Sequence, residues 1–141
     1  MEKCDSKYCS CLYYSANALS RIMTKMADET FAVTGLSSSY AFLLMTVNDK
    51  PGIQPNEIST IMQLTPSTIT RLIEKMETRG LLYREHSGRI TEVYPTQSSL
   101  DLDYKIKEAW KNLYQKYSNI LGKEKGDELA ALIHDATRKL E

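Results

Sequence analysis

The chain has 141 residues, with 18 lysines and arginines, 18 aspartates and glutamates, and therefore no formal net charge. This length predicts one domain, with or without helical extensions, and neutrality excludes a protein that coats polyanions indiscriminately. No apolar run approaches the ~20 residues of a membrane span, and the first residues carry acids where a leader would be apolar, so we expect a cytoplasmic protein with no membrane partner.

Three cysteines lie near the start of the chain, with the spacing C-x4-C-x-C: Cys4, Cys9 and Cys11. An odd number of cysteines in a chain expected to be cytosolic does not suggest a disulfide framework. Three interpretations remain open: ordinary thiols, a thiol switch, and a soft-metal site built from three thiolates. The metal interpretation lacks the fourth ligand that zinc usually takes, since neither His86 nor His134 is near in the sequence.

The first two helices are predicted from apolar residues at helical spacing. One helix spans about residues 8–29, and Gly35 can end the helical segment. Ser37 can cap a second helix, SSYAFLLMTV, which is apolar enough to be buried. Residues 48–52, NDKPG, have the composition of a turn. The apolar stripe of the first helix consists of Leu12, Ala16, Leu19, Ile22, Met23 and Met26.

Two further helices each begin near a proline. Pro55 suits the first turn of a third helix and Pro66 that of a fourth, because the N–H that proline lacks would be unpaired there. Thr65 is the candidate N-cap of the fourth helix, and Arg79 with Gly80 can end it. The third helix carries the apolar residues Ile58, Ile61 and Met62.

The fourth helix has one apolar face and one polar face. At ~100° per residue, its four large apolar residues cluster within about 60° on either side of one direction. They are Ile69, Leu72, Ile73 and Met76, and the residues opposite them are Ser67, Arg71, Glu74 and Thr78, flanked by Thr68, Thr70 and Lys75.

After residue 80 the sequence pattern changes to that of strands. The β-prone runs 81–85 and 90–94 enclose HSGR, where Ser87 and Gly88 make a hairpin turn plausible. From about residue 97, two helices separated near Gly122 carry apolar stripes. The order predicts a mostly α (α+β) winged helix-turn-helix over residues 37–96, flanked by a helix within 1–36 and two helices within 97–141. The two stripes are Leu100, Tyr104, Trp110, Leu113, Tyr117 and Ile120, then Leu129, Leu132, Ile133 and Leu140.

This fold places the fourth helix in the major groove of DNA. Short hydroxyls allow close approach to the duplex, arginine can bind guanine bidentately, and the helix N-terminus offers N–H groups to phosphate. A polar face by itself is common to all surface helices. The short preceding helix, the turn at Thr65 and a hairpin carrying Arg84 and Arg89 together favour DNA binding.

The segment IQPNEISTIMQLTPSTITRLIEKMETRGLLYRE, followed by a hairpin and a long helix, resembles the MarR family of bacterial transcription regulators. The likeness extends over essentially the whole chain, and its specific part is the helix-turn-helix. It implies a homodimer with interleaved N- and C-terminal helices, whose two reading helices lie ~34 Å apart over a palindromic operator. A dimer agrees with the long apolar stripes of the end helices, which a chain this small would have trouble covering.

By matching position, the resemblance implies which residues contact DNA. The hairpin, or wing, departs from the family pattern. The wing of the family usually has a longer loop that contains an Asp-x-Arg element, whereas this chain has only HSGR. We therefore expect Arg89, near the wing tip, to meet phosphate. The implied contacts in the fourth helix are Ser67, Thr68, Thr70, Arg71 and Lys75.

Regulators of this type usually respond to a molecule that binds or reacts. Some family members sense organic hydroperoxides through a cysteine near the start of the first helix, and Cys11 lies about two residues before that place. A small apolar or phenolic effector could instead enter between the end helices and the winged helix. Aromatics at helical spacing more often form a core or a dimer interface. The candidate pocket walls are Tyr13, Tyr14, Phe31, Tyr40 and Trp110.

We expect a dimeric repressor of transcription that needs no cofactor. An enzyme is not expected, since the chain has two histidines, no glycine-rich phosphate loop and no nucleophile–base spacing. One alternative is a winged-helix module for protein docking or dimerisation, which would expose apolar residues where Ser67, Arg71 and Thr78 stand. The other is a thiol-based redox or soft-metal sensor that uses the three cysteines.

Overall fold

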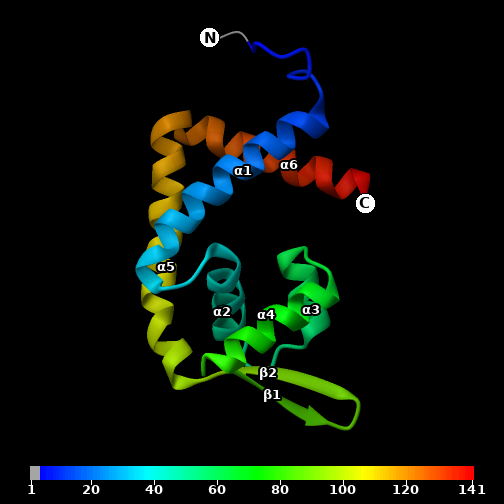
Figure 1. Cartoon of the computed structure of the whole chain (residues 1–141), viewed down its shortest axis with the longest axis vertical. Helices are drawn as coiled ribbons and strands as arrows, with labels where there is room; N and C mark the ends of the chain where they lie inside the picture. Colours follow the sequence, from blue (N-terminus) through cyan, green and yellow to red (C-terminus); the bar gives the residue numbers. More distant parts are fainter. Residues whose placement is uncertain (1–3) are drawn as a thin grey trace.

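The computed structural model describes residues 4–141; residues 1–3, the start of the predicted segment 1–36, lie outside the described residues. Within this range the chain forms six α-helices, a short 3₁₀ helix and one two-stranded sheet (Figure 1). The mostly helical winged-helix fold predicted from the sequence is confirmed. The elements are α1 (Leu12–Phe31), η1 (Ala32–Thr34), α2 (Ser38–Asp49), α3 (Pro55–Met62), α4 (Pro66–Thr78), β1 (Leu82–Ser87), β2 (Ile90–Pro95), α5 (Gln97–Leu121) and α6 (Lys123–Leu140).

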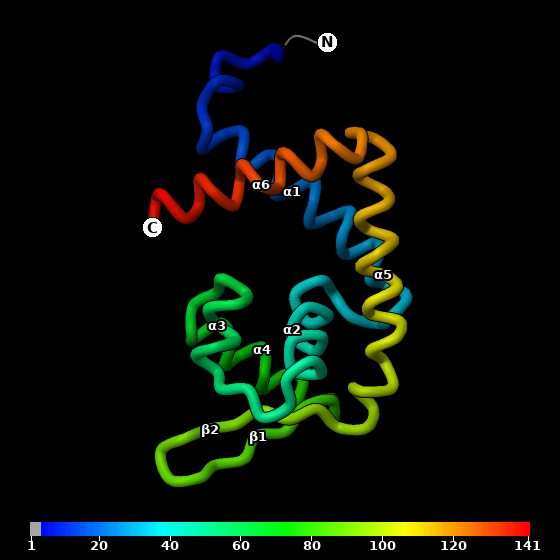
Figure 2. The backbone as a smooth tube through the Cα atoms, turned by 180° about the vertical axis from the view of Figure 1, so that it is seen from behind, coloured from blue at the N-terminus to red at the C-terminus, as the bar shows by residue number. Residues whose placement is uncertain are grey.

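The elements form two groups joined by one long helix. α1 and α6 cross at the end of the molecule that carries both termini, and α2, α3, α4 and the hairpin occupy the other end (Figure 1). α5 runs along one side from the hairpin to α6, and the view from behind shows the same arrangement (Figure 2). The hairpin projects beyond the helices, next to α4.

The first helix begins later than expected. The helix predicted over residues 8–29 is observed over Leu12–Phe31, because Cys11 is its extended N-cap and its carbonyl accepts the Ser15 N–H. Residues before it are tied in turns, in which the Cys11 N–H donates to the Tyr8 carbonyl. Gly35 ends the segment as predicted, with a φ of 75° that glycine adopts without strain.

The hairpin is shifted by one residue from its predicted turn. Ser87 pairs with Ile90, so the turn is Gly88–Arg89 and not Ser87–Gly88. Of the two turn residues only Gly88 has a positive φ, 64°, which is the pattern of a type II′ turn. An isolated bridge between Ile53 and Val93 joins β2 to the segment before α3.

The hydrophobic core lies where the winged helix meets α1 and α5. Phe31, Leu44, Ile58, Ile73 and Ile106 come from five successive helices and are each at most 1% exposed. Burial of a side chain of this size stabilises a fold by about 1.5–3 kcal/mol. Among the described residues, α6 contributes no side chain to this core. Buried core residues outside the predicted apolar stripes include Ile53 and Ile106, whereas Ile61, one of the apolar residues predicted on the third helix, is 55% exposed.

Among residues 4–141 no single helix is both long and apolar enough to cross a bilayer. The bent pair Leu12–Thr34 and Ser38–Asp49, at 61° to each other, reaches that length and composition only when its two parts are taken together.

Candidate nucleic-acid interface

Helix α4 is fixed at its start by the residues that the sequence predicted. The Thr65 hydroxyl accepts the Thr68 N–H at 3.3 Å, and Pro66 follows in the first turn. Ile69 and Ile73 are fully buried and Met76 is 1% exposed, so one face of the helix is packed into the core. The predicted apolar face is confirmed.

The opposite face of α4 is open to solvent. Ser67, Thr70, Arg71 and Lys75 are exposed, and Thr68 is half-buried because its hydroxyl lies 2.9 Å from that of Thr65. Within residues 4–141, neither Arg71 nor Lys75 takes part in an ion pair. Their charges are therefore available to an external anion. Five of the seven predicted DNA-contacting residues thus share one helix.

Arg89 lies at the tip of the hairpin and faces the start of α3. It is exposed and lines a polar cavity of about 230 Å³ together with Gln54, Asn56 and Thr91. Gln54 and Asn56 were not singled out in the sequence, where only the proline between them marked the start of a helix. The structure therefore adds amide and hydroxyl groups beside the arginine of the wing.

Arg84 occupies a different environment from the other predicted contacts. Its guanidinium Nη2 lies 2.8 Å from Glu77 Oε1 and 4.0 Å from Glu74 Oε1. Both carboxylates belong to α4, and the Arg84 side chain is 27% exposed. This residue connects the wing to the helix.

The opposite face of the hairpin carries a stacked tyrosine pair. The rings of Tyr83 and Tyr94, which lie opposite each other in the register, are 5.5 Å apart and 18° from parallel. Burial raises the pKa of Tyr94 above its usual value, and the carboxylates of Glu92 and Glu85 add to that shift. This face is therefore acidic and aromatic, unlike the face of α4.

The aromatic residues predicted to wall a pocket are not brought together. Tyr13 and Phe31 lie at opposite ends of α1, about 27 Å apart at about 1.5 Å per residue. Phe31 is fully buried in the core, whereas Tyr13 is 79% exposed. Trp110 and Phe31 each contact Phe42, at ring distances of 6.2 and 5.6 Å. Tyr13 and Phe31 therefore do not share one cavity wall within a subunit.

A cavity of about 380 Å³ does lie between α2 and α3, on the side of the winged helix. Its walls combine apolar side chains with hydroxyls, as a site for a small amphipathic molecule would. The lining residues are Ser38, Ser39, Phe42, Thr46, Ile61, Met62 and Leu64.

The N-terminal cysteines differ from the expectation of no disulfide. The structure pairs Cys4 with Cys9, whose Cα atoms are 6.1 Å apart, within the usual range for a bridged pair. Cys11 is exposed and unbridged. Across residues 4–141, no group of three or more His, Cys, Asp or Glu side chains is arranged to hold a metal ion.

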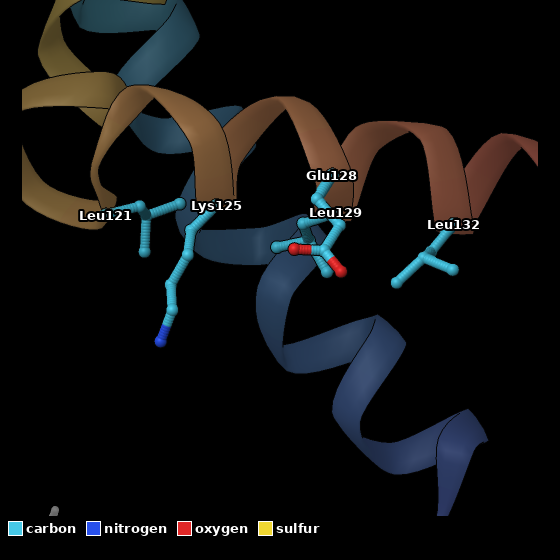
Figure 3. Close-up of a pocket in the computed structure, with 5 residues that line it drawn as sticks. All are labelled: Leu121, Lys125, Glu128, Leu129 and Leu132. Atoms are coloured by element: carbon cyan, nitrogen blue, oxygen red, sulfur yellow. The ribbon is translucent and has the colours of Figure 1, made fainter.

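Apolar side chains remain exposed on α1, the end of α5 and α6. Leu121, the last residue of α5, lies with Leu129 and Leu132 of α6 beside Lys125 and Glu128 (Figure 3), around a cavity of about 250 Å³. A second apolar groove, of about 180 Å³, runs between α1, α5 and α6. Other large apolar side chains that α1, α5 and α6 expose include Leu12, Ile22, Tyr104, Ile120, Ile133 and Leu140.

One family model matches part of the sequence. The sequence model of the MarR family matches residues 34–89, which extend from η1 to the hairpin turn. No curated protein matches the sequence.

Solved structures share the fold across nearly the whole chain. The transcriptional repressor CouR, bound to a 23-mer DNA duplex, is 17% identical with a TM-score of 0.84, over 97% of this chain and 99% of its own. The MepR–DNA complex of S. aureus is 19% identical with a TM-score of 0.78, over 91% of this chain and 97% of its own. CouR from Rhodococcus jostii RHA1, bound to p-coumaroyl-CoA, is 18% identical with a TM-score of 0.75, over 96% of this chain and 95% of its own.

Proposed function

Since residues 34–89 match the sequence model of the MarR family, we propose that the chain is a transcriptional repressor of this family that binds a palindromic DNA operator as a homodimer in the cytoplasm. In each subunit α4 enters the major groove and the hairpin tip reaches the adjacent backbone. The proposed contacts in α4 are Ser67, Thr68, Thr70, Arg71 and Lys75, and Arg89 is the contact from the wing.

The two faces of α4 are the observation that carries this proposal. A helix whose apolar face is buried through Ile69 and Ile73, and whose other face presents hydroxyls, Arg71 and Lys75, can read a groove without leaving the domain. A protein-docking module would expose apolar residues on that face. The DNA complexes of CouR and MepR, which have the same fold, support the proposal that this chain binds DNA.

Dimerisation is proposed through α1, α5 and α6. These helices expose leucines and isoleucines in the single subunit, and contiguous exposed apolar surface often marks a protein–protein interface. Pairing of two copies would also set the distance between their α4 helices, which must be about 34 Å for both to enter successive major grooves on one side of a duplex. The operator would then be two-fold symmetric.

Release by a small molecule is proposed at the cavity between α2 and α3. CouR with p-coumaroyl-CoA shows that this fold is found with an aromatic acyl ligand. The mixed apolar and hydroxyl lining, with Phe42 and Ser38, suits an apolar or phenolic effector. Thiol oxidation is the second route that we propose, because Cys4 and Cys9 are placed as a pair and Cys11 is exposed.

Selection of bound genomic fragments tests the function directly. Immobilised protein should retain fragments that share one inverted repeat, and fluorescence anisotropy should give an affinity that falls steeply as salt rises, because phosphates are neutralised. The matched control is Arg71→Glu, which should retain none of these fragments. Retention of the same fragments by both proteins, or an affinity indifferent to salt, would exclude α4 as the reading helix.

A further inference from the structure

We infer that Arg84 is a positioning residue of the interface: it braces the hairpin against α4 and neutralises the two carboxylates of that helix, without touching DNA. This inference rests on the proposed DNA-binding function and refines it. It removes one basic residue from the set of contacts and gives that residue an internal role.

The register of the hairpin directs Arg84 toward the helices. Arg84 lies opposite Val93, which is fully buried, and it shares the strand face of Leu82, which is 2% exposed. Successive side chains of a strand point to opposite faces, so the neighbours Tyr83 and Glu85 point away from the helices. Both of these neighbours are exposed.

The ion pair with Glu77 is partly shielded from solvent. The N–O distance is 2.8 Å, and the two side chains are 27% and 28% exposed, whereas that of Glu74 is 56% exposed at 4.0 Å. A half-buried pair is screened by salt less than an exposed one. Arg84 is therefore held chiefly by Glu77, with Glu74 as a second and weaker partner.

The pair also removes negative charge from the side of the helix that would approach DNA. Glu74 and Glu77 are the acids of α4, and Glu74 is exposed on its polar face. If Arg84 left them to bind a phosphate, two unpaired carboxylates would lie beside the duplex and repel it. Arg71 and Lys75 have no such internal partner in the described chain.

Arg84 is also the outermost anchor on its strand. Residues 85–87 of β1 and the turn residues Gly88 and Arg89 are all exposed. Beyond Arg84, β1 makes no further packing contact that buries a side chain, so the angle of the tip depends on this brace. Loss of the brace would let Arg89 leave the position that it holds beside Asn56.

Hydrogen exchange in the DNA-free protein tests the brace by itself. Arg84→Gln and Glu77→Gln should each speed amide exchange in residues 84–93 by about threefold or more, with α2 and α5 unchanged, because local opening frees that segment. Glu85→Gln, on the opposite face of the same strand, is the control and should leave this exchange unchanged. Unchanged exchange in both brace variants would overturn the inference, even where the wild-type protein binds DNA. Faster exchange in a protein that binds no DNA would support the brace and exclude the proposed function.

A charge swap then separates a brace from a contact. Arg84→Glu should weaken operator binding by about tenfold, and adding Glu77→Arg should restore it to within about threefold, because the pair is rebuilt in reverse. The slope of log affinity against log salt should return to that of the wild type. A direct phosphate contact predicts the opposite: the double variant stays as weak as Arg84→Glu and its slope stays lower by about one. That result would overturn the inference.

Discussion

The guanidinium of Arg79 donates hydrogen bonds to the carbonyl oxygen of Gly35, at 3.4 Å from Nη1 and 3.5 Å from Nη2. Arg79 is the C-cap of α4, and Gly35 closes η1 between α1 and α2. The contact therefore ties the end of the candidate reading helix to the junction with α1. Arg71, about two turns earlier on the same helix, is exposed and makes no ion pair within residues 4–141.

These two arginines should respond differently to truncation. Arg71→Ala should weaken operator binding by ~1–3 kcal/mol and relax base preference at one position, with no change in the free energy of unfolding. Arg79→Ala should lower that free energy by ~0.5–1.5 kcal/mol, since it removes an exposed hydrogen bond, and should leave base preference intact. Anisotropy with operator variants and urea denaturation measure the two effects. An Arg71→Ala protein with unchanged affinity would remove this residue from the interface.

The caps of α4 and α2 give a matched pair for stability. Thr65 accepts a hydrogen bond from the Thr68 N–H, whereas Ser37, the N-cap of α2, makes no such bond. Thr65→Ala should therefore lower the free energy of unfolding by ~1 kcal/mol, and Ser37→Ala by clearly less. Equal losses in urea denaturation would contradict the assignment of the Thr65 hydroxyl as a cap.

The proposed dimer can be tested at one leucine. Leu132 is 59% exposed on α6, and Ile61 is similarly exposed, at 55%, on α3. Leu132→Glu should convert the dimer to a monomer in sedimentation and abolish tight operator binding, because a charge would be buried between subunits. Ile61→Glu makes the same kind of change outside the end helices and should leave the dimer intact. Dimers in both variants would place the interface elsewhere.

The cysteines make a specific prediction about connectivity. When reduced protein is treated with hydrogen peroxide, the Cys4 and Cys9 thiols should be oxidised to one disulfide while the peroxide is reduced to two waters, leaving the Cys11 thiol. Peptide mass mapping identifies the bridge, and Cys4→Ser is the control that cannot form it. A Cys9–Cys11 bridge, or a link between chains, would contradict the pairing. Unchanged operator affinity on forming the bridge would exclude it as the signal.

Local signals explain what could be predicted from the sequence. The start of α4 was predicted correctly because Thr65, Pro66 and the apolar spacing act within one or two turns of the helix. The sequence prediction placed the turn one residue too early, at Ser87–Gly88. The register of the strands also depends on the packing of Val93, and not on the turn residues alone. The same packing turns Arg84 toward Glu77, which its place in the sequence could not reveal.

Long-range packing accounts for the remaining differences. Phe31 was grouped with Tyr13 because both are aromatic and were expected beside one crevice, yet only Phe31 reaches the core. Ile106 was missed because lysines surround it in the sequence, and its burial depends on how α5 lies against the other helices. The use of each face of a long helix is decided by neighbours that are distant in the chain.

The two-residue turn fixes how far the hairpin reaches for a given strand length. With only Gly88 and Arg89 between the strands, the distance from α4 to Arg89 depends on the length of the strands. Adding two residues to each strand would advance the tip by about 7 Å and keep every side chain on its face, whereas adding one would exchange the faces. Engineered versions of this hairpin could therefore change its reach only in steps of two residues.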